Sequence, residues 1–161
     1  MFNLAGILCL CLLWHQTPAP SGTPGPLDHN RVIAEFAAPE PDWLPGHRGL
    51  DLAADLGDTV ITPRAGWVVH AGAVAGTGVV VIRHGRLRAT YQSVAPSVRT
   101  GQYVGAGSVL GEVSRAGERN SSAHCTPGCI HWGLKDGEQY LDPRILIDAL
   151  SDVALVPQEH R

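Results

Sequence analysis

Short apolar segments, each bounded by glycine or proline, fill the sequence between residues 57 and 113. Their connections are about two to five residues long, which favours antiparallel neighbours joined by tight turns. The run Val79–Ile82 is continuously apolar, as expected for a central strand covered on both faces. With 19 glycines, 12 prolines and few helix-forming runs, the chain is predicted to be all-β. The predicted strands are 59–62, 66–72, 78–84, 86–94, 101–104 and 108–113.

Two more strands are predicted, at 31–36 and 129–134. In the later one the even positions are apolar, whereas Cys129 and His131 occupy odd positions. Because successive side chains of a strand point to opposite faces, the thiol and the imidazole share the face that is not apolar. The polar segment 114–128, rich in Gly and Ser, is typical of a surface loop.

The two ends of the chain differ from its middle. Leu4 to Trp14 is apolar and uncharged, too short to span a bilayer comfortably but suited to the core of a signal peptide. The positive charge that usually precedes such a core is missing, so an uncleaved N-terminal anchor remains an alternative. A short helix is predicted from Pro143 to Leu150, with Asp142 as its cap. The predicted organisation is a leader (1–22), a flexible linker (23–30), one β domain (31–150) and a tail (151–161).

The charge and the cysteine content limit the classes of partner and the cellular compartment that suit this chain. The net charge of -3 and the pI near 6.2, without any basic run, argue against nucleic acid as the leading partner. Export to an oxidising compartment favours a disulfide between Cys125 and Cys129. Two alternatives stay open for Cys129: a thiolate that closes a zinc site as fourth ligand, or an inert strand residue.

The segment 46–51 carries the clearest chemistry. His47 and Asp51 are four residues apart, so in an extended segment both side chains leave the same face, and Gly49 leaves that face open between them. His131 would add a second imidazole. Two imidazoles and one carboxylate leave a fourth tetrahedral position for water, the pattern of catalytic zinc. Such a metal acidifies its water and polarises a carbonyl, as peptide-bond hydrolysis requires.

A series of motifs across residues 45 to 147 resembles the lysostaphin- and LytM-type zinc endopeptidases (peptidase family M23), which cut peptide cross-links in bacterial peptidoglycan. The resemblance implies mainly antiparallel sheets forming a groove, of the duplicated hybrid motif type, and one Zn²⁺ held by His47, Asp51 and His131. The motifs are Gly-His-Arg-Gly-Leu-Asp-Leu-Ala-Ala (46–54), Gly-Asp-Thr-Val (57–60), Ala-Gly-Trp-Val-Val (65–69), Val-Val-Ile-Arg-His-Gly (80–85), Gly-Gln-Tyr-Val-Gly-Ala-Gly (101–107) and Leu-Asp-Pro (141–143).

Two positions depart from the family pattern. Cys129 stands where the family has the first histidine of its His-x-His element, and Ser93 stands where it has another catalytic histidine. Neither a serine nor a disulfide-bonded cysteine can supply that acid-base chemistry near neutral pH. His124, in the adjacent loop, is a candidate replacement, and Arg48 is a candidate rim residue for a substrate carboxylate.

Three functions follow as hypotheses. The first is an exported zinc endopeptidase of weak or altered activity, acting on peptidoglycan as a monomer. The second is an inactive module that binds peptidoglycan or activates another wall hydrolase. The third, a biotinyl- or lipoyl-type carrier, is disfavoured because the turn Gly105–Gly107 has no lysine to modify.

Overall fold

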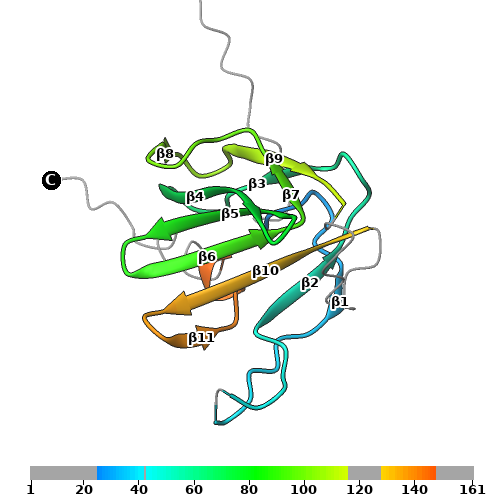
Figure 1. Ribbon diagram of the computed structural model, residues 1–161, viewed down its shortest axis with the longest axis vertical. Coiled ribbons are helices and arrows are strands. Elements are labelled where there is room, and N and C mark those ends of the chain that lie inside the picture. The colour runs from blue at the N-terminus through cyan, green and yellow to red at the C-terminus, as the bar shows by residue number, and fades with distance from the viewer. Residues whose placement is uncertain (1–24, 42, 116–127, 148–161) are drawn as a thin grey trace, which may run out of the picture.

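The described residues form eleven strands and one short helical turn (Figure 1). The structure, a computed structural model, describes residues 25–41, 43–115 and 128–147. The strands are β1 (Val32–Ala34), β2 (Gly49–Ala53), β3 (Thr59–Ile61), β4 (Gly66–Val74), β5 (Thr77–His84), β6 (Leu87–Gln92), β7 (Val94–Pro96), β8 (Tyr103–Val104), β9 (Val109–Val113), β10 (Cys129–Asp136) and β11 (Gln139–Leu141).

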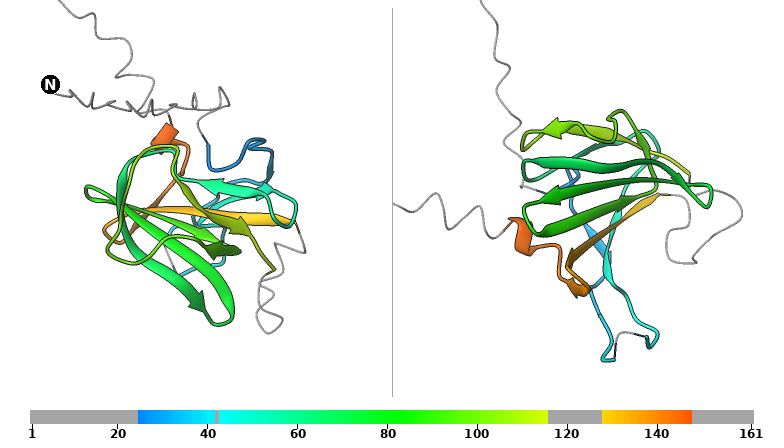
Figure 2. Two further views of the ribbon diagram at one scale, coloured as in Figure 1. Left: turned by 90° about the horizontal axis from the view of Figure 1, so that it is seen from above. Right: turned by 60° about the vertical axis from the view of Figure 1, so that its left-hand side comes forward.

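The strands form two antiparallel sheets. The larger has eight strands in the order β1-β2-β10-β6-β5-β4-β8, with β11 also paired to β10. The smaller has the order β3-β9-β7, and β7 packs against β4 and β5 of the larger sheet (Figure 2). The all-β prediction is therefore confirmed. The late strand β10 lies between β2 and β6, so it joins the beginning of the domain to its middle.

Side chains from both sheets share one hydrophobic core. In β10 the alternation predicted from the sequence is confirmed, because Ile130, Trp132 and Leu134 are all buried. The Trp132 ring stacks with the ring of Tyr91, with 6.4 Å between centroids. Val60 and Leu110 of the smaller sheet join the same core. The opposite face of the larger sheet is thus left to carry polar groups.

Local differences from the sequence-based expectations have simple causes. A flexible linker was expected at 23–30, but in its described part Leu27 is buried in the core and the Pro26 carbonyl accepts a hydrogen bond from Ile61 N–H. The expected C-terminal helix is a single helical turn at 145–147 within the described residues, and Asp142 Oδ1 accepts from Arg144 N–H as the predicted cap. The predicted strand 86–94 is divided at Ser93, whose φ of +66° ends β6 and lets Val94 begin β7, and β11 was not expected.

Candidate metal centre

The pairing of β2 with β10 brings two of the predicted ligands together. His131 lies directly opposite Asp51 in the antiparallel register, and Gly133 lies opposite Gly49. Directly opposed residues of neighbouring strands project from the same face of a sheet. The imidazole and the carboxylate therefore meet on the face away from the core, with two glycines beside them.

His47 lies just before β2 and is held by the backbone of the preceding segment. It forms an isolated antiparallel bridge with Ala37, and its Nδ1 lies 2.6 Å from the carbonyl oxygen of Glu35. A carbonyl only accepts hydrogen bonds, so His47 Nδ1 carries the hydrogen. Its Nε2 faces the centre, 3.1 Å from Asp51 Oδ1 and 3.2 Å from His131 Nδ1. This outer hydrogen bond fixes the tautomer that metal-ligating histidines need.

Asp51 is the buried member of the group. Its side chain has no exposed area, and Oδ1 lies 2.8 Å from His131 Nδ1. Burial raises the pKa of Asp51, but the hydrogen bonds and charge of His131 and His47 outweigh it and hold the pKa below the usual value. The second oxygen, Oδ2, is buried without a hydrogen-bond partner. An ionised carboxylate with an unsatisfied oxygen in such a place favours a nearby cation.

The three side chains fit a zinc ion. One ligand atom from each of His47, Asp51 and His131 lies within 4.8 Å of the others, and in the described part of the chain no other group of metal-ligating side chains converges in this way. Asp51 Oδ1 lies within hydrogen-bond distance of both imidazoles, so one oxygen and two ring nitrogens already converge on one place. Two imidazole nitrogens and one carboxylate oxygen are typical zinc ligands.

Gly49 keeps room for the His131 ring. A Cβ at this position would lie 2.6 Å from His131 Nε2 and 2.5 Å from the Trp132 carbonyl oxygen, closer than real Cβ contacts. The sequence-based expectation that Gly49 leaves the face open therefore has a specific cause, the ring that lies across it. Any other residue would displace either the ring or the β10 backbone.

Two other predicted site residues that the structure describes, Ser93 and Arg48, make separate contacts. Ser93 is nearly buried between β6 and β7, with φ of +66°, and its carbonyl accepts from Ser114 N–H. Among the described residues no hydrogen bond connects Ser93 with the metal ligands. Arg48 donates to the Leu44 carbonyl and lies over the Tyr140 ring, 5.5 Å from its centroid. Its role as a substrate rim residue stays a prediction.

Cys129 begins β10 opposite Ala53, two residues from His131. Its side chain is buried and is not a free thiol. The predicted partner Cys125 and the candidate imidazole of His124 both lie outside the described residues, so the disulfide pairing and the role of His124 stay predictions.

The sequence reasoning missed the contribution of Glu35. Its backbone carbonyl orients His47, and a backbone carbonyl leaves no signature in residue type. The predicted strand at 31–36, placed beside the segment around His47, is the signal that could have suggested the contact.

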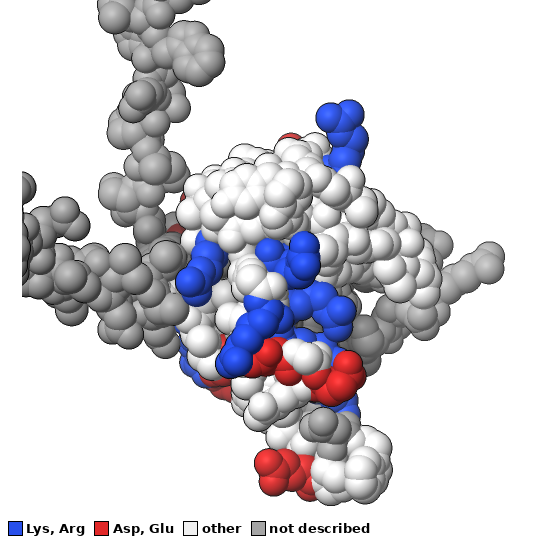
Figure 3. Space-filling model, turned by 90° about the vertical axis from the view of Figure 1, so that its left-hand side faces the viewer, with Lys and Arg blue, Asp and Glu red and all other residues white. Residues whose placement is uncertain are grey.

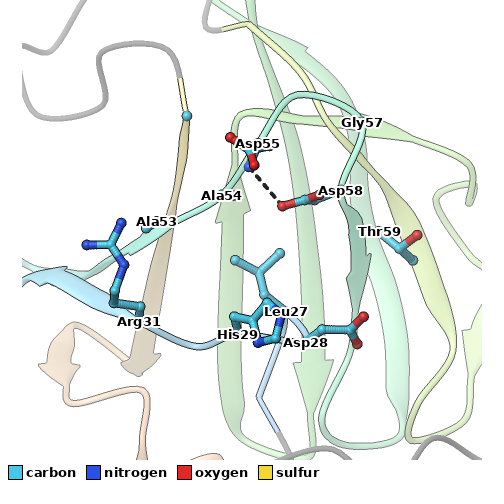
Figure 4. A pocket seen from close by; sticks show the side chains of 11 residues that line it. Leu27, Asp28, His29, Arg31, Ala53, Ala54, Asp55, Gly57, Asp58 and Thr59 are labelled. Atoms are coloured by element: carbon cyan, nitrogen blue, oxygen red, sulfur yellow. Dashed lines mark hydrogen bonds between the residues drawn. The ribbon is translucent and has the colours of Figure 1, made fainter.

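A pocket of about 560 Å³ lies at one end of β2, beyond the metal ligands (Figure 4). Its wall includes Asp28, His29 and Arg31 from the segment before β1, with Asp55 and Asp58 from the turn before β3. The Asp58 carboxylate accepts a hydrogen bond from Asp55 N–H, as the dashed line in Figure 4 marks. This hydrogen bond stabilises the turn between Asp55 and Asp58. None of the three metal ligands lines the pocket.

Comparison with known proteins gives a consistent result. The model of peptidase family M23 matches residues 45–143. The uncharacterized protein Rv2891 of Mycobacterium tuberculosis is 40% identical over 113 residues, which are 70% of this chain and 45% of that protein. This chain thus spans about half the length of the curated relatives it matches.

Two solved structures share the fold. A zinc containing peptidase from Vibrio cholerae is 21% identical with a TM-score of 0.60, over 76% of this chain and 39% of that one. Lysostaphin is 19% identical with a TM-score of 0.62, over 85% of this chain and 57% of that one. At these identities the likeness concerns the architecture alone.

Proposed function

Because this chain belongs to peptidase family M23, we propose that it is an exported zinc metalloendopeptidase-like protein acting on the peptide cross-links of bacterial peptidoglycan, with weak or altered catalysis. The observation that carries the proposal is the convergence of His47, Asp51 and His131 on one face of the sheet. One Zn²⁺ held by these side chains would polarise a substrate carbonyl and acidify a water molecule.

Each ligand residue has a distinct part in preparing the centre. Asp51 supplies a buried negative charge that offsets part of the charge of the ion. His47 is held in the ligating tautomer by the Glu35 carbonyl. His131 lies over Gly49 and Gly133, whose lack of side chains makes room for its ring.

The altered catalysis follows from Ser93 and Cys129. At these positions the family has histidines that move protons during the reaction. A buried serine and a cysteine that is not a free thiol have no group that titrates near neutral pH to replace them. General acid-base catalysis is typically worth about 100- to 10,000-fold in rate, so turnover is expected to be slower by a factor in this range.

The same two substitutions favour a second candidate function. A chain that keeps the metal ligands without the proton-transferring histidines would suit a module that binds peptidoglycan or activates another wall hydrolase. In this case zinc would stabilise the fold and shape the surface, and purified protein would cut nothing by itself.

Export is proposed from the apolar run 4–14 of the predicted leader (1–22) and from the compartment in which wall peptides occur. Within the described residues, no helix has the length and apolar character needed to cross a bilayer. A disulfide between Cys125 and Cys129 suits an oxidising compartment. If the folded, non-reduced chain reacts at Cys129 with a thiol reagent, the disulfide is excluded.

The two candidate functions are separated by a direct assay. Purified chain with one equivalent of zinc is incubated with peptidoglycan between about pH 6 and pH 9, and new amino groups are counted. The hydrolase predicts release that His47→Ala abolishes. Tight zinc binding without any release would refute hydrolysis and leave the binding module. A chain that binds no zinc would remove the metal centre from both candidates.

A further inference from the structure

Three basic residues stand side by side across the larger sheet. In the strand registers, Arg83 of β5 lies opposite Arg88 of β6, and Arg88 lies opposite Lys135 of β10. We call Arg83, Arg88 and Lys135 the basic row. Figure 3 looks at the side of the molecule where these strands turn, and there Lys and Arg side chains gather next to a band of Asp and Glu.

The basic row shares its face with the metal centre. His131 and Lys135 are four residues apart in β10, whose pairing has no bulge, so both side chains project from the same face. At about 3.3 Å per residue, four residues span roughly 13 Å. An extended peptide with one bond at the metal ligands would therefore reach the row about four residues further along.

Aromatic side chains stand at both ends of the row. Beyond Arg83, the register continues to Trp67 of β4 and Tyr103 of β8, whose rings meet edge to face with 5.2 Å between centroids. Both rings are about half exposed, 49% and 58%. At the other end Lys135 Nζ lies 4.6 Å from the centre of the Tyr140 ring. Large exposed rings beside cations are common at binding surfaces.

The arrangement is unfavourable for the folded chain alone. Like charges directly opposite in neighbouring strands destabilise a sheet, and here two such pairs follow each other. Among the described residues Lys135 has one ion-pair partner, the exposed Glu138, at 3.3 Å. Among the described residues neither Arg83 nor Arg88 forms an ion pair. The chain carries a net charge of -3, so the row is not the result of a generally basic composition.

From these observations we propose that the basic row binds free carboxylates of the substrate peptide, in an acidic segment about four residues from the bond held at the metal centre. This inference rests on the proposed function, whose site it extends. The charge is complementary, the surface is continuous with the metal ligands, and the guanidinium fork of arginine matches a carboxylate in two parallel hydrogen bonds. The exposed rings would flank the bound segment.

The test measures binding without hydrolysis. A fluorescent hexapeptide with two adjacent glutamates, and its twin with two glutamines, are titrated with the metal-free full chain in chelator, and anisotropy is recorded. The acidic peptide should bind at least about tenfold more tightly than its twin, and Arg83→Gln or Arg88→Gln should each weaken it about fivefold. Equal binding of the twins would overturn the inference.

Arg86→Gln is the matched control. Arg86 lies in the same hairpin but is paired with Asp136 at 2.8 Å and stands outside the row, so its loss should leave affinity unchanged. Affinity lost equally in this variant would contradict a specific role of the row. Polyphosphate serves as a second probe, and binding to polyphosphate with no binding of the acidic peptide would overturn the proposal in favour of a phosphate polymer.

The outcomes separate this inference from the proposed function. Metal-free chain that binds the acidic peptide through Arg83 and Arg88, but never cuts peptidoglycan when loaded with zinc, supports the row and refutes hydrolysis. Active protein that does not distinguish the twins refutes the row and leaves hydrolysis standing. Melting temperatures of all variants show that each one is folded.

Discussion

Replacing Gly49 by alanine tests the geometry of the metal centre without removing a ligand. The added Cβ would stand 2.5 Å from the Trp132 carbonyl oxygen and 2.6 Å from His131 Nε2. Both distances are nearly an ångström shorter than the 3.4 Å at which ordinary contact begins. The carbonyl belongs to a central strand paired on both sides and cannot move far, so the His131 ring has to turn away.

Two quantities should change together. Displacing a ligand through its supporting contacts typically lowers metal affinity about 10- to 100-fold. Overpacking a well-packed place costs about 1–3 kcal/mol of unfolding free energy. Zinc affinity is measured by competition with a coloured zinc indicator, and unfolding free energy by urea titration of the metal-free chain.

Gly72→Ala is the control for this experiment. Gly72 lies in β4 of the same sheet, and a Cβ there would come no closer than 3.9 Å to another heavy atom outside its chain neighbours. Neither zinc affinity nor stability should fall. If Gly49→Ala bound zinc as tightly as the unmodified chain, His131 would not depend on the space above Gly49, and the assignment of this ring as a ligand would be refuted.

Three more predictions concern single side chains. Asp51→Asn should lower zinc affinity by at least about 100-fold in the indicator assay, because it removes the charged ligand; unchanged affinity would exclude Asp51. Burial lowers the pKa of His84 below 6.5, despite its hydrogen bond to the Ala65 carbonyl. As the pH falls, His84 is therefore protonated in the unfolded chain before it is protonated in the folded chain. Stability should therefore fall as the pH drops below about 6.5, and His84→Gln should flatten this slope in urea titrations done in chelator; an unchanged slope would contradict it. Arg88→Gln should raise the unfolding free energy by about 0.2–1 kcal/mol, since Arg88 lies between Arg83 and Lys135. A lower unfolding free energy of this variant in urea titration would contradict that reasoning.

Much of the metal centre could be predicted because strands have a simple period. The even spacing of His47 and Asp51 and the alternation in β10 were enough to place each imidazole and the carboxylate on polar faces. His47 lies outside β2, in an isolated bridge, but its side chain is still on the same side as that of Asp51, as the four-residue spacing predicts. That β10 would pair with β2 could not be derived from local pattern, since the two strands are about eighty residues apart, and there the family resemblance was needed.

The composition of residues 25–30 led to a wrong prediction, because a single residue anchors this segment to the core. The segment 25–30 has the proline and glycine of a linker, yet Leu27 fills a place in the core and docks the segment. The basic row was also missed, because Arg83, Arg88 and Lys135 become neighbours only when β5, β6 and β10 are in register. The stretch 79–82 was expected to be covered on both faces, but Val81 is only half-buried while Val80 and Ile82 are fully buried.

The separation of the ligands along the chain has a consequence for biogenesis. His131 follows His47 by 84 residues and Asp51 by 80, whereas the hairpins β4-β5 and β5-β6 join neighbours in sequence. Local hairpins close quickly, and distant pairings form last because their loop entropy is larger. During synthesis His47 and Asp51 would emerge first, and these two ligands alone would not retain an ion until β10 pairs with β2 and adds His131. Zinc capture would then mark the end of folding, and retained zinc would distinguish finished molecules from partly folded ones.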